Sequence, residues 1–329
     1  MATSFNALRT YKIDGLVVNK MEHLHLDDLG AGEVVIKTAF SSINYKDALG
    51  ISGKGSIYKK FPIIGGIDVS GVVESSQDAY FLPGDRVLVT GCNFGEAFDG
   101  GFSEYVRVPA QAVVKIPDPL SLRDVMIYGT AAFTAALCLH RMETNGQKPD
   151  RGPIVVTGAS GGVGSFATAL FAGRGYEVIA ISSKGDRASF LRELGAAQVL
   201  LPTELKLGAG ALEKGRFGGA VDNVGGTQLA GLLASTNLWG NVASVGLAQS
   251  HLLSTTVMPF ILRGVSLLGI SSNNCEMKLR YQIWKNLAGD WKISQLERFV
   301  SQTIGLEQIE STCHDMIEQK TFGRILVSM

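Results

Sequence analysis

A cluster of glycines between residues 158 and 164 carries the strongest chemical signal in the chain. The segment reads Val155-Val156-Thr157-Gly158-Ala159-Ser160-Gly161-Gly162-Val163-Gly164-Ser165, between an apolar run and a helical pattern. Glycines at such a strand-to-helix turn let the backbone approach a pyrophosphate, and the helix N-terminus offers free N–H groups to the anion. Ala159 stands where the strict pattern has its first glycine, so this is an AxGxxG variant of the dinucleotide turn. We predict cofactor binding by Ser160, Gly161, Gly162 and Val163. The alternative is a tight turn with no ligand.

The end of the next predicted strand bears on the choice between the two nicotinamide cofactors. NAD enzymes place Asp or Glu there to bind the ribose 2′-OH. This chain has Ser182-Ser183-Lys184 instead, with Arg187 close behind and Asp186 beyond the usual place. Hydroxyls and cations suit a 2′-phosphate, which a carboxylate would repel. We therefore predict NADPH, held here by Ser182, Ser183, Lys184 and Arg187. A solvated helix start is the alternative for the two cations.

The elements that must position these residues change in character near residue 120. Before it, β-rich runs at 34–36 and 87–89 and the alternating run 102–108 predict an antiparallel, barrel-like domain. After it, a helical pattern over 121–139 leads into strands that alternate with helices over 154–270, which predicts a doubly wound parallel sheet. We expect an α/β protein with domains at 1–122 and 123–269, and a tail, 270–329, that returns to the first domain through a strand at 324–327.

Composition limits the classes of function. Lys plus Arg and Asp plus Glu are both 30, so the basic excess of a broad nucleic-acid surface is missing. No unbroken apolar run long enough for a membrane span and no signal-peptide pattern are visible, so we expect a cytoplasmic protein. The four cysteines are far apart, and His23 and His25 have no cysteine beside them. A metal site of closely spaced Cys and His ligands is therefore not expected.

Several further motifs resemble the medium-chain dehydrogenase/reductase superfamily over nearly the whole length. Those shared with the superfamily are Pro83–Val87, Gly100–Tyr105, the glycine turn, Asp222–Gly226 and Val245–Leu247. Those shared with a zinc-free branch of quinone oxidoreductases and acryloyl-CoA reductases are Ser42–Leu49, Gly53–Gly55, Gly129–Ala135 and Thr255–Arg263. The resemblance implies a GroES-like catalytic domain, a Rossmann domain and a homodimer that pairs through the edge strand 265–270.

The resemblance also implies a site without metal. Zinc alcohol dehydrogenases of this superfamily carry cysteine where Asn44 stands, and Gly-His-Glu where Gly66-Ile67-Asp68 stands. Without a Lewis acid, an alcohol substrate loses the usual stabilisation of its alkoxide. Reduction of a conjugated double bond instead needs hydride at the β-carbon and hydrogen-bond donors for the developing enolate.

Three residues are candidates for the chemistry. Asn44 is expected near the nicotinamide and the substrate as an amide donor, with turn capping as its alternative. Tyr45 is expected to donate its phenol to the enolate or to shape the pocket, although packing explains it equally well. Asp68 follows an apolar strand, where a carboxylate is costly unless it is hydrogen-bonded. It is expected to orient Asn44 or Tyr45, or else to bind the N–H groups of a turn.

The remaining candidates concern the cofactor and the substrate's phosphates. Thr130 is expected at a helix start facing the nicotinamide ribose, with capping as the alternative. Arg324 is expected to reach the cofactor or the pocket mouth, with a surface salt bridge as the alternative. The resemblance adds Gly246, Leu247 and Ser272 as cofactor contacts. Exposed lysines that would attract the phosphates of a CoA thioester, or would only be solvated, are Lys54, Lys59 and Lys60. Related enoyl-thioester reductases use a tyrosine where this chain has Gly53-Lys54-Gly55, so the proton donor stays open and water is a candidate.

Together these features predict an NADPH-dependent reductase of a small 2-enoyl substrate, with acryloyl-CoA favoured by the resemblance. Quinones and alkenals are alternatives of the same class. The alternative of another class is a non-catalytic NADPH-binding sensor or structural protein, as in the lens crystallins related to this superfamily. Only a measurement of turnover distinguishes it from a reductase.

Overall fold

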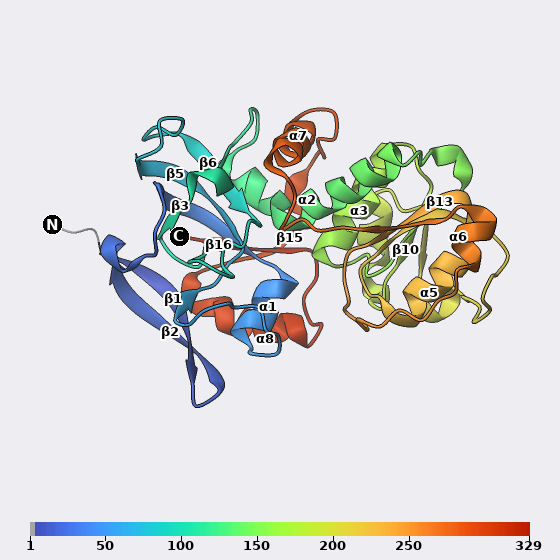
Figure 1. Cartoon of the computed structure of the whole chain (residues 1–329), viewed down its shortest axis with the longest axis horizontal. Helices are drawn as coiled ribbons and strands as arrows, with labels where there is room; N and C mark the ends of the chain where they lie inside the picture. The colour runs from blue at the N-terminus through green and yellow to red at the C-terminus, as the bar shows by residue number, and fades with distance from the viewer. Residues whose placement is uncertain (1–3) are drawn as a thin grey trace. The chain divides into compact units, whose positions relative to one another are not determined.

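The computed structural model describes residues 4–329, which fall into two compact units. The first unit comprises the chain up to Thr130 together with Ser272–Met329, and the second comprises Ala131–Ser271. Figure 1 labels the elements of both units.

The first unit is built on two sheets. A three-stranded sheet has the order β2-β1-β4, and a larger one has the order β15-β16-β3-β5-β6-β8, with β7 also paired to β3. All of these pairings are antiparallel except that of β15 with β16. The strands are β1 (Ser4–Ile13), β2 (Leu16–His25), β3 (Val34–Ile43), β4 (Ile63–Ile64), β5 (Asp68–Ser76), β6 (Arg86–Thr90), β7 (Tyr105–Val108), β8 (Val114–Lys115), β15 (Val300–Ile304) and β16 (Arg324–Ser328).

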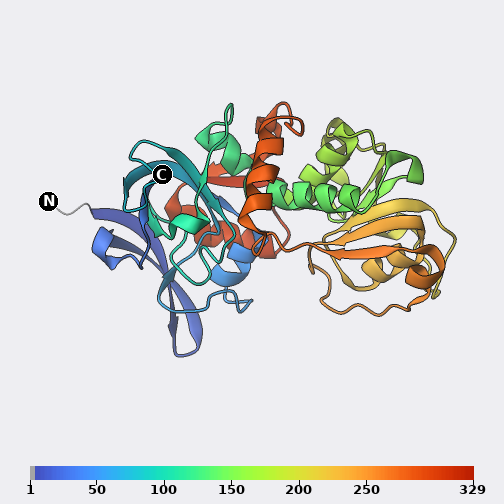
Figure 2. The same ribbon diagram turned by 45° about the horizontal axis from the view of Figure 1, so that its top comes forward.

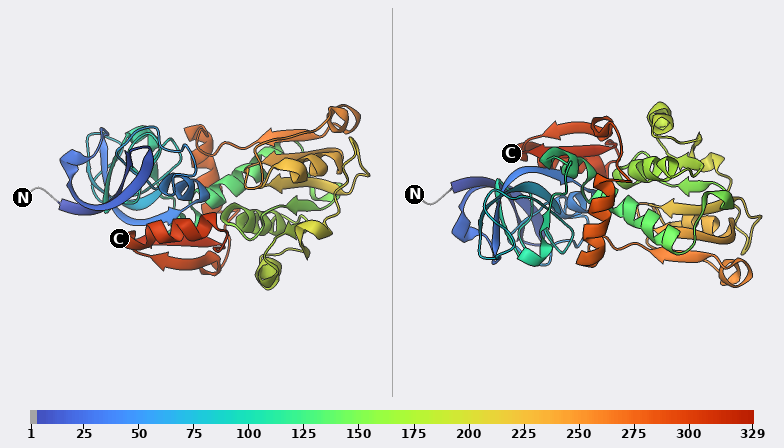
Figure 3. Two further views of the ribbon diagram at one scale, coloured as in Figure 1. Left: turned by 90° about the horizontal axis from the view of Figure 1, so that it is seen from below. Right: turned by 90° about the horizontal axis from the view of Figure 1, so that it is seen from above.

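The end of the chain completes the larger sheet of this unit. β16 pairs antiparallel with β3, with Ile325 opposite Ile43 and Leu326 opposite Ser42. The C-terminal elements therefore lie beside strands formed by the first fifty residues, as Figure 3 shows in red and blue. β15 was not predicted, because the sequence indicated only one strand, 324–327, in the tail 270–329. The helices of this unit are α1 (Tyr45–Ile51), α7 (Met277–Ala288) and α8 (Ile309–Ile317).

The second unit confirms the predicted doubly wound sheet. Its six strands are all parallel and have the order β11-β10-β9-β12-β13-β14. Counted along this unit, that is the order 3-2-1-4-5-6 of dinucleotide-binding sheets, whose ligands bind where the order reverses. Helices cover both faces of the sheet (Figure 2). The elements are β9 (Ile154–Val156), α3 (Gly162–Gly173), β10 (Val178–Ile181), α4 (Ala188–Glu193), β11 (Gln198–Leu200), β12 (Phe217–Asp222), α5 (Gly226–Ala234), β13 (Thr236–Ser244), α6 (Met258–Arg263) and β14 (Ser266–Gly269).

One helix, α2 (Leu122–Thr144), is long and apolar enough by composition to cross a membrane. However, 78% of its apolar window is buried inside the protein, which is typical of a core helix. Its geometry is broken at Gly129, where φ is 49° and ψ is −160°. This break matters for the site described next.

Candidate active site and dinucleotide site

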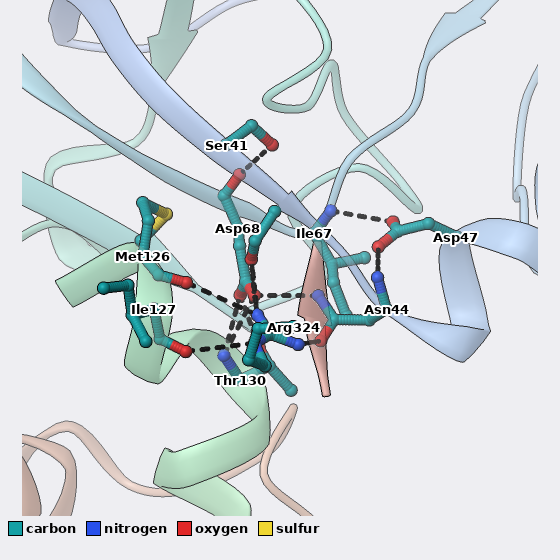
Figure 4. Close-up of polar contacts among 10 residues, drawn as sticks. Ser41, Asn44, Asp47, Ile67, Asp68, Met126, Ile127, Thr130 and Arg324 are labelled. Carbon is teal, nitrogen blue, oxygen red and sulfur yellow. Dashed lines mark hydrogen bonds and ion pairs between the residues drawn. The ribbon is translucent and has the colours of Figure 1, made fainter. Parts of the chain in front are cut away.

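Asp68 is the centre of a buried polar network in the first unit (Figure 4). Its carboxylate is inaccessible to solvent, at 0% exposure, and lies at the start of β5. Oδ2 accepts hydrogen bonds from Ser42 Oγ at 2.8 Å, Asn44 Nδ2 at 2.7 Å and the Thr130 backbone N–H at 2.9 Å. Oδ1 accepts the Thr130 hydroxyl at 2.6 Å. A buried carboxylate is costly unless its oxygens are satisfied, and these donors satisfy them.

Arg324 supplies the countercharge, from the first residue of β16. It is 2% exposed, and its Nη2 lies 3.5 Å from Asp68 Oδ2. The guanidinium also donates to the Ile127 carbonyl at 3.0 Å, to Ser42 Oγ at 2.7 Å and to Asn44 Oδ1 at 3.0 Å. Burial lowers the pKa of Arg324, and the Asp68 charge opposes that shift. The surface salt bridge considered from the sequence is therefore wrong, because the ion pair lies in the interior.

These two charges fix the orientation of the Asn44 amide. Its Nδ2 faces the acceptor-only carboxylate of Asp68, and its Oδ1 faces the donor-only guanidinium of Arg324. An amide NH2 group has two hydrogens, and Asp68 takes one of them. Apart from a minor contact with the Asp47 carboxyl, the second N–H has no partner among residues 4–329, so Asn44 can present one oriented donor to a ligand.

Gly129 explains how Thr130 reaches the carboxylate. A Cβ at position 129 would lie 2.5 Å from Arg324 Nη2 and 2.6 Å from Asp68 Oδ2. Its left-handed φ is also one that side chains rarely adopt. Breaking the helix here aims both the N–H and the hydroxyl of Thr130 at Asp68. Thr130 thus lies at the start of the helical segment that follows the break, as the sequence suggested.

A second buried carboxylate, Asp47, holds the backbone of Asn44 in place. Its Oδ2 accepts the Asn44 backbone N–H at 2.8 Å, and its Oδ1 accepts the Ile67 N–H at 2.9 Å. It therefore joins the start of α1 to the residue before Asp68. Burial raises the pKa of Asp47 to about 7, and the Asp68 charge adds to the shift against the effect of these hydrogen bonds. Sequence reasoning missed Asp47, although an Asn followed three residues later by an acidic residue is typical of helix N-termini.

Tyr45 is not part of the network. It is the first residue of α1 and is 43% exposed. Of the three roles considered for Asp68 from the sequence, it contacts Asn44 and binds a backbone N–H, that of Thr130, and it does not contact Tyr45. Ser42, which donates to Asp68 and accepts from Arg324, joins the network without having been singled out from the sequence.

The glycine turn of the second unit has the geometry of a diphosphate cradle. It connects β9 to α3, whose N-cap residue Gly161 makes no side-chain cap. The first N–H groups of a helix have no partner within it, so they are available to an anion. A Cβ on Gly164 would lie 2.3 Å from the Gly158 carbonyl oxygen, so α3 packs against the turn at a distance that excludes other residues.

A third buried carboxylate joins the ends of β9 and β12, where the strand order reverses. Asp222 accepts the Thr157 hydroxyl at 2.8 Å and the Gly225 N–H at 2.7 Å. Asn223 donates its side-chain amide to the Thr157 carbonyl at 2.7 Å. Burial raises the pKa of Asp222 against these hydrogen bonds. Thr157, Asp222 and Asn223 were quoted as motif residues but were not predicted as site residues.

The residues predicted to hold the ribose phosphate lie at the end of β10. The Ser182 hydroxyl donates to the Ser160 hydroxyl at 3.0 Å and accepts the Lys184 N–H at 3.0 Å. The strand end is thus tied to the glycine turn. Burial lowers the pKa of Lys184, and the charge of Arg187 lowers it further. Arg187 also lies 3.1 Å from Asp186, so its charge is partly compensated. Ser183 is exposed beside them.

The other predicted cofactor contacts are placed as follows. Gly246 follows β13, and a Cβ there would lie 2.4 Å from the Asn223 carbonyl oxygen. Leu247 is 58% exposed. Ser272 lies in the first unit, where its carbonyl accepts a hydrogen bond from Arg280 at 2.7 Å. Their roles toward a cofactor stay predictions.

No group of three or more His, Cys, Asp or Glu side chains within residues 4–329 is placed to hold a metal ion. The four cysteines are free thiols. The zinc-free site stays a prediction.

Two family models match the chain. One, described as an alcohol dehydrogenase GroES-like domain, covers residues 30–118, and the other, described as a zinc-binding dehydrogenase, covers residues 162–288. The first match lies within the first unit, and the second covers most of the second unit and continues into the first as far as residue 288.

Full-length relatives and solved structures agree with these models. YhfP of Bacillus subtilis, a quinone oxidoreductase by name, is 42% identical and is matched over 100% of both chains. AcuI of Ruegeria pomeroyi, an acrylyl-CoA reductase, is 39% identical over 99% of both. The crystal structure of the yhdH oxidoreductase of Salmonella enterica in complex with NADP has a TM-score of 0.95 at 42% identity, over 98% of this chain and 99% of that one. The crystal structure of YhfP with NAD bound has a TM-score of 0.96 at 42% identity, over 100% of both. The chain therefore belongs to the medium-chain dehydrogenase/reductase superfamily, in its zinc-free branch.

Proposed function

We propose that this protein is an NADPH-dependent reductase of the conjugated C=C bond of a short 2-enoyl thioester, with acryloyl-CoA the favoured substrate. The oriented N–H of Asn44, held between Asp68 and Arg324, is the observation that carries the proposal. The likeness over the full length to an acrylyl-CoA reductase supports it.

The Asn44 amide acts on the substrate's carbonyl in this proposal. When hydride adds to the β-carbon, the electrons of the C=C bond move toward the thioester oxygen. The second N–H of the Asn44 side chain donates a hydrogen bond to the developing enolate oxygen. A donor already fixed by its neighbours loses no reorganisation energy when the charge develops. The α-carbon then takes its proton from water, for which the network needs no acid of its own.

The glycine turn at 158–164 binds the nucleotide in this proposal. The uncapped start of α3 and the close approach enforced at Gly164 fit a diphosphate. NADPH, when bound, supplies the hydride that adds to the β-carbon. Ser182, Ser183, Lys184 and Arg187 would hold the 2′-phosphate, for which two neighbouring cations are suited.

The cofactor preference can be tested apart from the substrate. We expect a higher kcat/KM with NADPH than with NADH. Lys184→Ala combined with Arg187→Ala should bring the two kcat/KM values closer together, mainly by raising the KM for NADPH. A wild-type kcat/KM for NADH equal to that for NADPH would contradict the assignment. Relatives of equal identity have been crystallised with NADP and with NAD, so the measurement is decisive.

The reaction is tested by following NADPH oxidation with acryloyl-CoA, crotonyl-CoA and a benzoquinone. We expect acryloyl-CoA to give the highest kcat/KM, and Asn44→Ala to lower kcat by about 10²- to 10³-fold, as loss of one oxyanion donor does. Absence of turnover with both thioesters would remove the proposal. Absence of turnover with every substrate, with NADPH still bound, would favour a non-catalytic protein.

Quinone reduction is the second candidate, favoured by the likeness to YhfP. The same Asn44 donor would serve a quinone oxygen that gains negative charge. A benzoquinone kcat/KM above that of acryloyl-CoA would make it the principal activity.

The proposal includes a homodimer that works in the cytoplasm. β14 is an edge strand of the parallel sheet, with one side unpaired. Large apolar side chains are exposed on β13, which pairs with β14, and on α6, which precedes β14: Trp239 at 67%, Ile261 at 72% and Leu262 at 56%. Edge strands and apolar patches of this kind are commonly covered by a second copy about a two-fold axis. A monomer in sedimentation at micromolar concentration would contradict the dimer.

A further inference from the structure

We propose that a cavity beyond the C-terminal end of α1 binds the adenosine 3′,5′-bisphosphate end of a CoA thioester. This inference rests on the proposed function, because it names the part of the substrate that lies away from the reacting bond. It concerns the first unit alone.

The cavity has a volume of about 240 Å³. It lies between the turn that joins β1 to β2 and the segment that follows α1. The lining residues that bear on its chemistry are Lys12, Gly15, Lys54, Ser56, Tyr58 and Phe61. The volume is below that of a site for a whole drug-sized ligand and suits one end of a longer molecule.

Its charge is positive. No Asp or Glu lines the cavity, and neither Lys12 nor Lys54 forms an ion pair within the described residues 4–329. The segment 53–62, which forms one wall, contains three lysines and no acidic residue. Glu318 is near enough to Lys54 to feel its charge, but its direct partner is Lys320 at 2.5 Å. Unpaired ammonium groups around a concave site attract phosphates.

The cavity also has an aromatic wall. Phe61 is 37% exposed, and its ring stands edge-on to that of Tyr58, with centroids 5.9 Å apart and planes at 89°. The Tyr58 ring lies directly against Gly50, where an added Cβ would meet it at 2.6 Å. The tyrosine is therefore held in place, and the half-exposed phenylalanine beside it offers a face on which a nucleobase can stack. Cationic groups beside an exposed aromatic ring fit a phosphorylated nucleoside better than a simple anion.

The distance to the reacting centre suits the two ends of one substrate. Asn44 precedes α1, and Gly50, near the other end of the helix, lines the cavity. A helix of seven residues is about 10 Å long. The pantetheine arm of a CoA thioester separates its carbonyl from its nucleotide, so the carbonyl at Asn44 and the nucleotide in the cavity can belong to one molecule.

The test compares acryloyl-CoA with the truncated substrate acryloyl-pantetheine. We expect Lys12→Glu combined with Lys54→Glu to raise the KM for acryloyl-CoA about tenfold, the effect of losing two partly exposed ion pairs, with kcat unchanged. The KM for acryloyl-pantetheine should not change, and added salt should raise the KM for acryloyl-CoA in the wild type and the control but not in the Lys12/Lys54 variant. Lys37→Glu combined with Lys292→Glu, at two other exposed lysines of this unit, is the control of equal charge and should leave both KM values unchanged.

A second measurement separates this inference from the proposed function. Calorimetry with adenosine 3′,5′-bisphosphate, at saturating NADP⁺, should show binding to the wild type and to the control but not to the Lys12/Lys54 variant. Binding without any turnover of acryloyl-CoA would uphold the cavity and overturn the proposed reaction. Turnover of acryloyl-CoA with the same KM in the wild type and the Lys12/Lys54 variant would overturn the cavity and uphold the reaction.

Discussion

Each unit buries a carboxylate at one terminus of a strand, Asp68 at the start of β5 and Asp222 at the end of β12, but the two carboxylates are stabilised differently. Asp68 in the first unit pairs with the buried guanidinium of Arg324, and Asn44 lies between the two charges. Asp222 in the second unit accepts only neutral donors, namely the Thr157 hydroxyl and the Gly225 N–H.

The difference follows from what each carboxylate must hold. Asp222 joins two strand ends, and backbone and hydroxyl donors suffice for that. Asp68 must fix the direction of a side-chain amide, which carries a donor and an acceptor on one planar group. An acceptor-only partner and a donor-only partner together define which end of the amide points where, and Asp68 and Arg324 are such a pair. The charged pair therefore serves orientation, and the neutral cluster serves the shape of the turn.

Breaking the ion pair should give the largest effect. Arg324→Met leaves Asp68 buried without a countercharge, so we expect a loss of about 3–5 kcal/mol in the free energy of unfolding, measured by urea denaturation. Adding Asp68→Asn should recover part of that loss, because the unpaired charge is then gone. If the loss in the double variant equals the sum of the losses in Arg324→Met and Asp68→Asn alone, the pair does not act as a unit. Neither variant should keep the kcat of the wild type, since both release Asn44.

Titration of Asp47 should come next. The pKa of Asp47 is raised from 3.8 to about 7 in the folded protein, so the folded state binds more protons than the unfolded state between these values. Stability from this group is present below pH 4 and is lost as pH rises toward 7, with a slope of at most about 1.4 kcal/mol per pH unit.

The measurement is the difference in unfolding free energy between the wild type and Asp47→Asn at pH 5, 6, 7 and 8. We expect the wild-type value to fall relative to the variant up to pH 7 and then to run parallel to it. A constant difference across the range would show that Asp47 does not titrate there.

Two glycines of the cofactor turn, Gly164 and Gly161, should differ in how strongly an added methyl group affects stability and NADPH binding. Gly164→Ala places a methyl group 2.3 Å from the Gly158 carbonyl oxygen, so we expect a cost of about 1–3 kcal/mol in stability and weaker NADPH binding by calorimetry. Gly161→Ala meets the same oxygen at 3.3 Å and should cost less on both measures. Equal losses in the two variants would contradict the close approach as the cause.

The smallest effect compares one hydroxyl from each cluster. Ser42→Ala removes a bond to each member of a charged pair, whereas Thr157→Val removes bonds to Asp222 and to the Asn223 N–H. Hydrogen bonds to paired charges are the stronger, so Ser42→Ala should cost about 1 kcal/mol more in the free energy of unfolding. A larger loss for Thr157→Val would contradict the claim that the hydrogen bonds of Ser42 to the charged pair are stronger than those of Thr157.

Much of the second unit could be predicted from the chain because its signals are local. The glycine turn, the alternation of strands and helices and the ends of β9 and β10 are read within windows of a few residues, and the parallel sheet confirms them. Asn44 and Asp68 were likewise visible as residue types in motif positions. β15 was missed because its five residues, Val300–Ile304, are flanked by helical patterns and become a strand by pairing with β16.

The sequence by itself determined the glycine cradle and placed an amide and a carboxylate where metal ligands stand in related enzymes. Only the tertiary structure decided that Arg324 contacts both of them, because its contact with Asn44 joins residues 280 positions apart and depends on the register of β16 against β3. It also decided that Asp47 is buried and accepts the backbone N–H of Asn44, and that Tyr45 is exposed. Burial and long-range pairing set the charge state and direction of these groups, and neither is encoded in any short stretch of the chain.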